Sequence, residues 1–258
     1  MVAGAACGGL LAEHMAHTSM RPGFWVSLLC AVWCVYTGDH LLDARRAGPE
    51  LATPRHAFHR RHARVLIAAL VGVAIVGLAA AWTLRPPVRL FGLGLGLAVL
   101  AYLASAQSFI LPDLPKEPIA GILYATGIWG GPIIMGEGST SWVLLAAAFH
   151  ALAAVLNLMM IGIFEVEADR VQGHRSIARR AGPGRTRAIV LMAGGAGATA
   201  AAGFALGAPS FFGFAILALQ VATPPILLLA HRRAVQHERY RTWGDAVFLL
   251  GALPRLSS

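Results

Sequence analysis

The stretch FEVEADRVQGHRSIARR, residues 164–180, comes directly after about twenty uncharged and mostly apolar residues. It begins with three acids, Glu165, Glu167 and Asp169, and continues into arginines. Ionisable side chains are costly inside a bilayer, so a charged cluster after an apolar run of this length is typical of the point where a helix leaves the membrane. The stretch therefore predicts a membrane helix over about 142–165 with a group of acids at its end.

The composition of the whole chain supports a membrane protein. Of its 258 residues, 57% are hydrophobic and only 13% are charged, a balance unlike that of soluble domains. We expect one domain over residues 1–258, an all-α integral membrane protein with about nine transmembrane helices. The expected spans are about 1–17, 22–43, 63–83, 88–107, 118–136, 142–165, 186–206, 210–230 and 241–254.

The first and last of these spans are the weakest, and the charged residues of the first predict a truncated or interfacial helix. Gly92, Gly94 and Gly96, and the small residues of 193–203, lie inside spans, where small side chains favour close helix packing. Trp129 falls near the end of its span and suits either an aromatic belt or the lining of a lipid pocket.

The basic residues are distributed unevenly along the chain. Of 21 lysines and arginines, 17 follow the second, fourth, sixth or eighth span. By the positive-inside rule, these segments and the N-terminus face the cytoplasm. The net charge of +9 therefore encodes topology, and we expect no nucleic-acid partner. Arginine outnumbers lysine 20 to 1, which indicates a GC-rich bacterial genome and hence a bacterial plasma membrane.

Two pairs of acids share the same spacing. The second span ends in GDHLLDARR, residues 38–46, and Asp39 and Asp43 are four residues apart, as are Glu165 and Asp169. Residues four apart share one face of a helix, and two like charges there need a cation. Carboxylate oxygens suit Mg²⁺, which completes its shell with water and phosphate.

Other interpretations of these acids stay open. They could mark helix ends and pair in water with neighbouring arginines. Glu167 lies about 200° around the helix from Glu165 and so points elsewhere if the helix continues. Arginines just beyond the pairs, such as Arg45 and Arg175, could instead bind the phosphates of a metal-bound ligand.

At the second pair the sequence resembles the UbiA superfamily of intramembrane prenyltransferases. The family motif is D-x-E-x-D-x-x-x-G-x-x-S/T-L-A, and the chain has Glu165-x-Glu167-x-Asp169-x-x-x-Gly173-x-x-Ser176-Ile177-Ala178. The resemblance covers nearly the whole chain, because the spacing of the spans agrees. It implies a bundle around a central cavity, with Mg²⁺ held by the catalytic acids Asp39, Asp43, Glu165 and Asp169, and with Glu167 as a further ligand.

The first motif departs from the family pattern N-D-x-x-D-x-x-x-D. If Asp39 and Asp43 are its last two acids, Val35 and Tyr36 stand where the family has Asn and Asp. Glu165 also replaces an aspartate in the second motif. The resemblance therefore implies a divergent branch, whose substrate or reaction differs from that of ubiquinone or menaquinone biosynthesis.

The resemblance also implies the substrates. A polyprenyl diphosphate would place its headgroup between the acidic motifs, and its prenyl group would pass to an aromatic or other lipophilic acceptor. Lys116, in LPDLPKEP, and Arg175 are the predicted diphosphate contacts, and Arg45 is a further one. Asn157 suits either the cavity or an interhelical hydrogen bond, and Tyr124 either the prenyl pocket or structural packing.

Three other functions deserve comparison. His56, His59 and His62 in 54–62 have a spacing that could bind metal, as in histidine-iron oxidoreductases, but a basic segment that covers an anionic headgroup is the simpler interpretation. The D-G-x-x-A-R opening of CDP-alcohol phosphotransferases is absent. The competing hypothesis is a catalytically inactive descendant that binds lipid or a partner protein.

Overall fold

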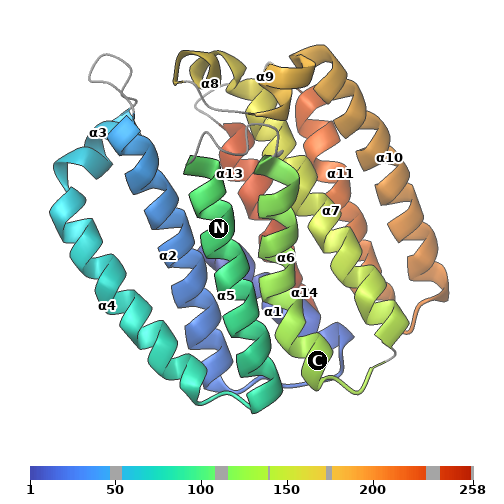
Figure 1. Cartoon of the computed structure of the whole chain (residues 1–258). Coiled ribbons are helices and arrows are strands. Elements are labelled where there is room, and N and C mark those ends of the chain that lie inside the picture. Colours follow the sequence, from blue (N-terminus) through green and yellow to red (C-terminus); the bar gives the residue numbers. More distant parts are fainter. Residues whose placement is uncertain (47–53, 108–115, 139, 173–175, 231–238, 257–258) are drawn as a thin grey trace.

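The computed structural model describes residues 1–46, 54–107, 116–138, 140–172, 176–230 and 239–256, which form helices and short connections without a strand among them (Figure 1). Each expected span falls on helix. The long helices are α2 (Pro22–Arg46), α4 (Ala63–Trp82), α5 (Pro86–Gln107), α6 (Lys116–Met135), α7 (Thr140–Phe164), α10 (Pro183–Gly207) and α11 (Phe211–Leu229).

These seven helices are long and apolar enough to cross a membrane, which confirms an all-α membrane protein. The expected number of nine transmembrane spans is therefore only approximate, because the first and last expected spans are not among these seven helices. The first span is α1 (Val2–Met15), a short helix whose Leu11 and Ala12 are fully buried. It is truncated but not interfacial, because it packs inside the bundle. The last span is divided into α13 (Arg239–Ala246), η3 (Val247–Ala252) and α14 (Leu253–Leu256).

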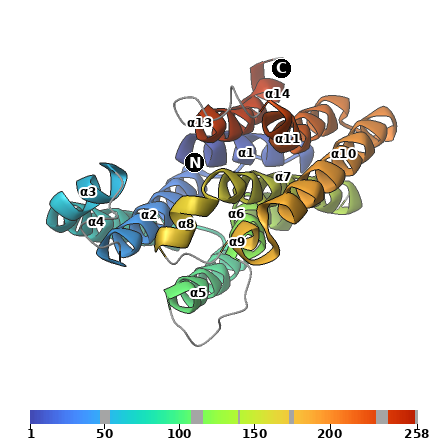
Figure 2. The same ribbon diagram turned by 90° about the horizontal axis from the view of Figure 1, so that it is seen from above.

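Three further helices lie in segments expected to be loops: α3 (Pro54–Arg61), α8 (Val166–Gln172) and α9 (Ile177–Ala181). They gather at the end of the bundle where α2 and α7 finish, at the top of Figure 1. Figure 2 looks down on this end and shows α8 and α9 between α2 and α10. Both acidic motifs therefore lie at one end of the molecule.

Helices pack closely against each other at some of the glycines but not at all of them. A Cβ on Gly121 of α6 would lie 2.8 Å from the backbone nitrogen of Val155 on α7, so the two backbones approach directly. Gly194 is covered by the side-chain ring of Pro225, whose Cγ would lie 2.7 Å from an added Cβ. Gly92, Gly94 and Gly96 have no neighbour within 4 Å among the described residues. The packing interpretation was wrong for these three glycines, which lie on an outer face of α5.

The interior contains polar side chains as well as apolar ones. His150 of α7, Gln220 of α11 and Trp129 of α6 are fully buried. Their polar nitrogen and oxygen atoms have no hydrogen-bond partner that meets strict geometry in the described part of the chain. Because Trp129 packs against His150, with ring centroids 6.0 Å apart, it belongs to the core and not to an aromatic belt.

Candidate functional site at the end of the bundle

The first motif forms a compact group of possible metal ligands on the last turns of α2. Ligand atoms of Asp39, His40 and Asp43 all lie within 4.8 Å of one another, and each of these side chains is half-buried. Tyr36 is one turn earlier and packs against the His40 ring at a centroid distance of 4.2 Å. The predicted acidic pair is thus a mixed group of two carboxylates and one imidazole.

The histidines of 54–62 do not act as one set. His59 on α3 faces α2, and its ring centroid is 5.3 Å from that of His40. The ring of His62 instead packs on Phe58 of its own segment, and His62 Nδ1 lies 3.0 Å from the Phe58 carbonyl oxygen. The side chain of His56 is outside the described residues. The structure therefore brings only His59 of the described histidines in this segment to the first motif.

In the second motif, Glu165 is joined to the C-terminal part of the chain. The Arg241 guanidinium forms an ion pair with Glu165 Oε1, and the Tyr240 hydroxyl donates to the same oxygen at 2.8 Å. Burial, and then the negative charge of Glu165, raise the pKa of Tyr240 to about 12, so the hydroxyl keeps the proton that it donates. Glu165 thus already has a cation and a hydrogen-bond donor.

The other acids of this motif are oriented differently. Asp169 N donates to the Glu165 carbonyl at 2.8 Å, so these two residues are one helical turn apart as the spacing predicts. Asp169 is half-buried, whereas Glu167 is exposed. Ser176 is the N-cap of α9 and accepts from Arg179 N at 3.4 Å. Arg175, a predicted diphosphate contact, lies outside the described residues.

Sequence reasoning missed a buried acid between the motifs. Glu117, in the first turn of α6, is only 8% exposed. Its Oε1 accepts from Ile177 N at 2.8 Å, at the start of α9, while its Oε2 has no hydrogen-bond partner among the described residues. The signal was its position as the single acid of an otherwise apolar helix, directly after Lys116.

Glu117 and Tyr102 connect the two motifs electrostatically. The charge of Asp169 in the second motif acts on Glu117. On α5, the Tyr102 hydroxyl is reached by the charges of Glu117 and of both aspartates of the first motif. The acids of both motifs therefore act electrostatically on residues of α5 and α6 that lie between them. Acids gathered at one end of the bundle attract cations, and carboxylates supply the oxygen ligands of divalent metals.

The remaining predicted contacts occupy three different places. Lys116 is half-buried at the start of α6, next to Glu117, and Arg45 is exposed on the last turn of α2, so both lie at the acidic end. Asn157 is buried on α7 and packs against Gly244 of α13. It therefore faces the C-terminal helices.

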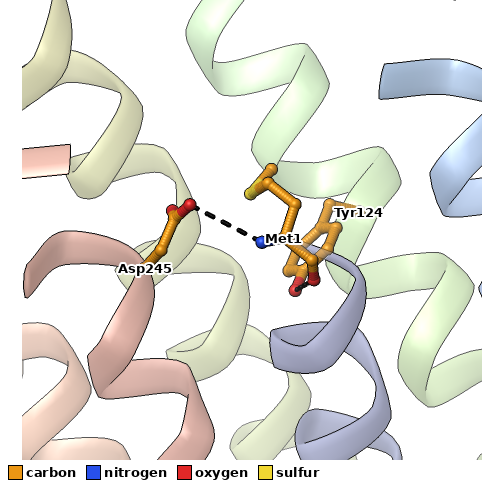
Figure 3. Close-up of polar contacts among 3 residues, drawn as sticks. All are labelled: Met1, Tyr124 and Asp245. Carbon is orange, nitrogen blue, oxygen red and sulfur yellow. Dashed lines mark hydrogen bonds and ion pairs between the residues drawn. The ribbon is translucent and has the colours of Figure 1, made fainter. Parts of the chain in front are cut away.

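Tyr124 lies deeper in the bundle. Its hydroxyl donates to the Met1 carbonyl at 3.5 Å, and the Met1 amino group is 3.5 Å from Asp245 Oδ2. Figure 3 shows Tyr124 of α6 and Asp245 of α13 on either side of Met1. Tyr124 also stacks on His150, with ring centroids 6.1 Å apart. A contact with substrate stays a prediction for Tyr124 and for Asn157.

The comparisons with known proteins agree with this arrangement. The model of the UbiA prenyltransferase family matches residues 2–252. Among solved structures, the chain is similar to the apo structure of a UbiA homolog from Aeropyrum pernix K1, with a TM-score of 0.73 and 17% identity over 99% of this chain and 97% of that one. No curated protein sequence matches. Because the family model spans nearly the whole sequence, the chain belongs to the UbiA prenyltransferase family.

Proposed function

We propose that the protein is a Mg²⁺-dependent prenyltransferase, which binds a polyprenyl diphosphate between the two acidic motifs and transfers the prenyl group to an aromatic or other lipophilic acceptor. The observation that carries the proposal is the presence of both acidic motifs, with Asp39 and Asp43 on α2 and Asp169 on α8, at one end of a membrane bundle. A diphosphate is itself negatively charged, so it can bind there only through cations.

The donor atoms of the two motifs fit this role. Asp39 and Asp43 offer oxygens within 4.8 Å of one another, and Asp169 lies at the other side with Glu167 near it in sequence. Glu165 stays a predicted ligand, although its charge is already balanced by Arg241. Mg²⁺ held by these carboxylates would supply positive charge to the diphosphate oxygens.

The chain's own residues would bind and orient the substrates. Lys116, Arg45 and Arg175 are the proposed cations for the diphosphate, and apolar helices surround its tail. The bond between the allylic carbon and the diphosphate oxygen breaks, and both electrons leave with the diphosphate. The acceptor then gives an electron pair to the allylic carbon and loses a proton. A site enclosed by helices excludes the water that would otherwise take the prenyl group.

A catalytically inactive protein that binds lipid or a partner subunit is the second candidate. Two observations favour it. Tyr36 stands where the family motif has an aspartate, and it packs on His40. Glu165 is engaged by Arg241 and Tyr240. Both features reduce the number of carboxylates available to metal.

Release of inorganic diphosphate decides between these candidates. The purified protein in detergent is given geranyl, farnesyl or geranylgeranyl diphosphate with Mg²⁺ or with chelator, and with membrane extract as a source of acceptor. We expect release with Mg²⁺, none with chelator, and loss of at least about tenfold in Asp39→Asn and Asp169→Asn. Glu137→Gln is the matched control, because Glu137 is exposed beyond the opposite end of α6. No release from any donor would favour the inactive protein.

We also propose a place for this chemistry, the cytoplasmic face of a bacterial plasma membrane. The support is the concentration of arginine in the segments at the acidic end, which the positive-inside rule places in the cytoplasm. A water-soluble diphosphate headgroup would then reach the site from the cytoplasm, while the prenyl tail enters from the bilayer.

A further inference from the structure

We infer that the first motif binds a first-row transition ion in preference to Mg²⁺, through Asp39, His40 and Asp43, with His59 of α3 as a fourth donor. The inference deepens the proposed function and rests on it for the diphosphate that such an ion would meet. It concerns the ligands of this chain, which differ from the all-carboxylate pattern implied by the family motif.

The helix geometry places the three first ligands together. At 100° per residue, Asp39, Asp43 and His40 fall within an arc of about 100° on α2. Their ligand atoms lie within 4.8 Å of one another. Among the described residues, no other set of three histidine, cysteine, aspartate or glutamate side chains lies this close together. An ion with bonds of about 2.0–2.2 Å can contact three atoms separated by less than this distance after small side-chain rotations.

His59 lies beside this group without being part of it, so its ring would have to move closer to bind the same ion. Its ring centroid is 5.3 Å from that of His40, and the two rings are nearly perpendicular, at 84°. Two imidazoles that bind one ion at tetrahedral angles, with bonds of about 2.1 Å, have centroids roughly 5 Å apart. Tyr36 packs on the ring of His40, with the two ring centroids 4.2 Å apart, and so restricts the orientation of the His40 ring.

The donor types decide which class of ion is favoured. Mg²⁺ prefers oxygen ligands in near-octahedral geometry and retains water. Imidazole nitrogen suits Zn²⁺, Fe²⁺ and neighbouring transition ions, whereas carboxylate, carbonyl and water oxygens suit Mg²⁺. Two carboxylates with one or two imidazoles therefore bind a transition ion more tightly than Mg²⁺. The remaining positions on such an ion can take water or diphosphate oxygens.

Metal binding without substrate tests this inference. Purified protein in detergent is titrated with Zn²⁺ and Mg²⁺, and a sample loaded with Mn²⁺ is examined by pulsed electron paramagnetic resonance for coupling to imidazole ¹⁴N. We expect Zn²⁺ to bind at least about 100-fold more tightly than Mg²⁺, and His40→Gln to lower Zn²⁺ affinity at least about tenfold while Mg²⁺ affinity stays within about twofold. The nitrogen coupling should vanish in the double variant His40→Gln/His59→Gln.

His62→Gln is the matched control, because His62 is also in the histidine segment but packs on Phe58; its Zn²⁺ affinity and spectrum should equal those of the wild type. A wild-type Mn²⁺ spectrum with oxygen ligands alone, or nitrogen coupling that survives in the double variant, would overturn the inference. Mg²⁺-dependent diphosphate release together with an all-oxygen spectrum would keep the proposed function and reject the transition-ion site. Nitrogen coupling without diphosphate release would do the reverse.

Discussion

At the scale of single residues, Glu117 holds α9 against α6. Replacing it with alanine removes the acceptor of the Ile177 N–H, at 2.8 Å, and leaves a part-buried donor unsatisfied, which costs about 1 kcal/mol. We expect the unfolding temperature in detergent to fall by several degrees in Glu117→Ala and much less in Glu117→Gln, which keeps an acceptor oxygen. Glu137→Ala is the control, since Glu137 is exposed. Equal losses in the alanine and glutamine variants would show that charge, and not the hydrogen bond, matters.

Glu165 and Arg241 form an ion pair, and we expect the stability contributed by each side chain to depend on the presence of the other. Arg241→Met should leave the carboxylate without its cation, at a cost on the order of 2 kcal/mol, because both side chains are mostly buried. Glu165→Gln/Arg241→Met should recover most of that loss, since neither charge remains. Thermal unfolding of both single variants and the double variant measures the coupling. Additive losses would contradict the pair.

At the scale of elements, local patterns predicted the long helices well and their partners poorly. The apolar runs located the spans, and the spacing of Glu165 and Asp169 predicted one turn between them, as the hydrogen bond from Asp169 N shows. The ion pair to Arg241 joins residues far apart in sequence, so no local pattern contains it. Glu117 was missed as a member of the site for the same reason, because it comes from a different helix. His59 was expected near the headgroup, but the local pattern could not show that it alone of the described histidines in 54–62 faces His40.

The glycines show how far composition predicts packing. Gly121→Ala should force α6 and α7 apart, because its Cβ would lie 2.8 Å from Val155 N, and backbone cannot move as a flexible side chain can. Gly94→Ala should leave stability unchanged or slightly higher, because no described atom lies within 4 Å and alanine favours helix. Thermal unfolding of the two variants compares these positions directly. A loss in Gly94→Ala as large as that in Gly121→Ala would mean that α5 packs against another molecule.

At the scale of the whole molecule, the two acidic motifs lie at the same end of the bundle because α2 and α7 both finish there (Figure 1). The alternation of basic and uncharged segments predicted this arrangement, since each span reverses direction. It could not predict how α3, α8 and α9 fold over that end, because short polar segments adopt the structure that their tertiary contacts favour. The outline of the site was therefore readable from sequence, while its ligand set required the structure.

The orientation in the membrane is a property of the whole chain and can be measured directly. Arg60 of α3 and Arg85 between α4 and α5 are both exposed and lie at opposite ends of α4. In a background where the three cysteines are replaced by alanine, Arg85→Cys should react with a membrane-impermeant maleimide in intact cells. Arg60→Cys should react only after the cells are permeabilised, because the positive-inside rule places the arginine-rich end in the cytoplasm. The opposite labelling pattern would place both acidic motifs outside the cell and remove cytoplasmic access of the diphosphate to its proposed site.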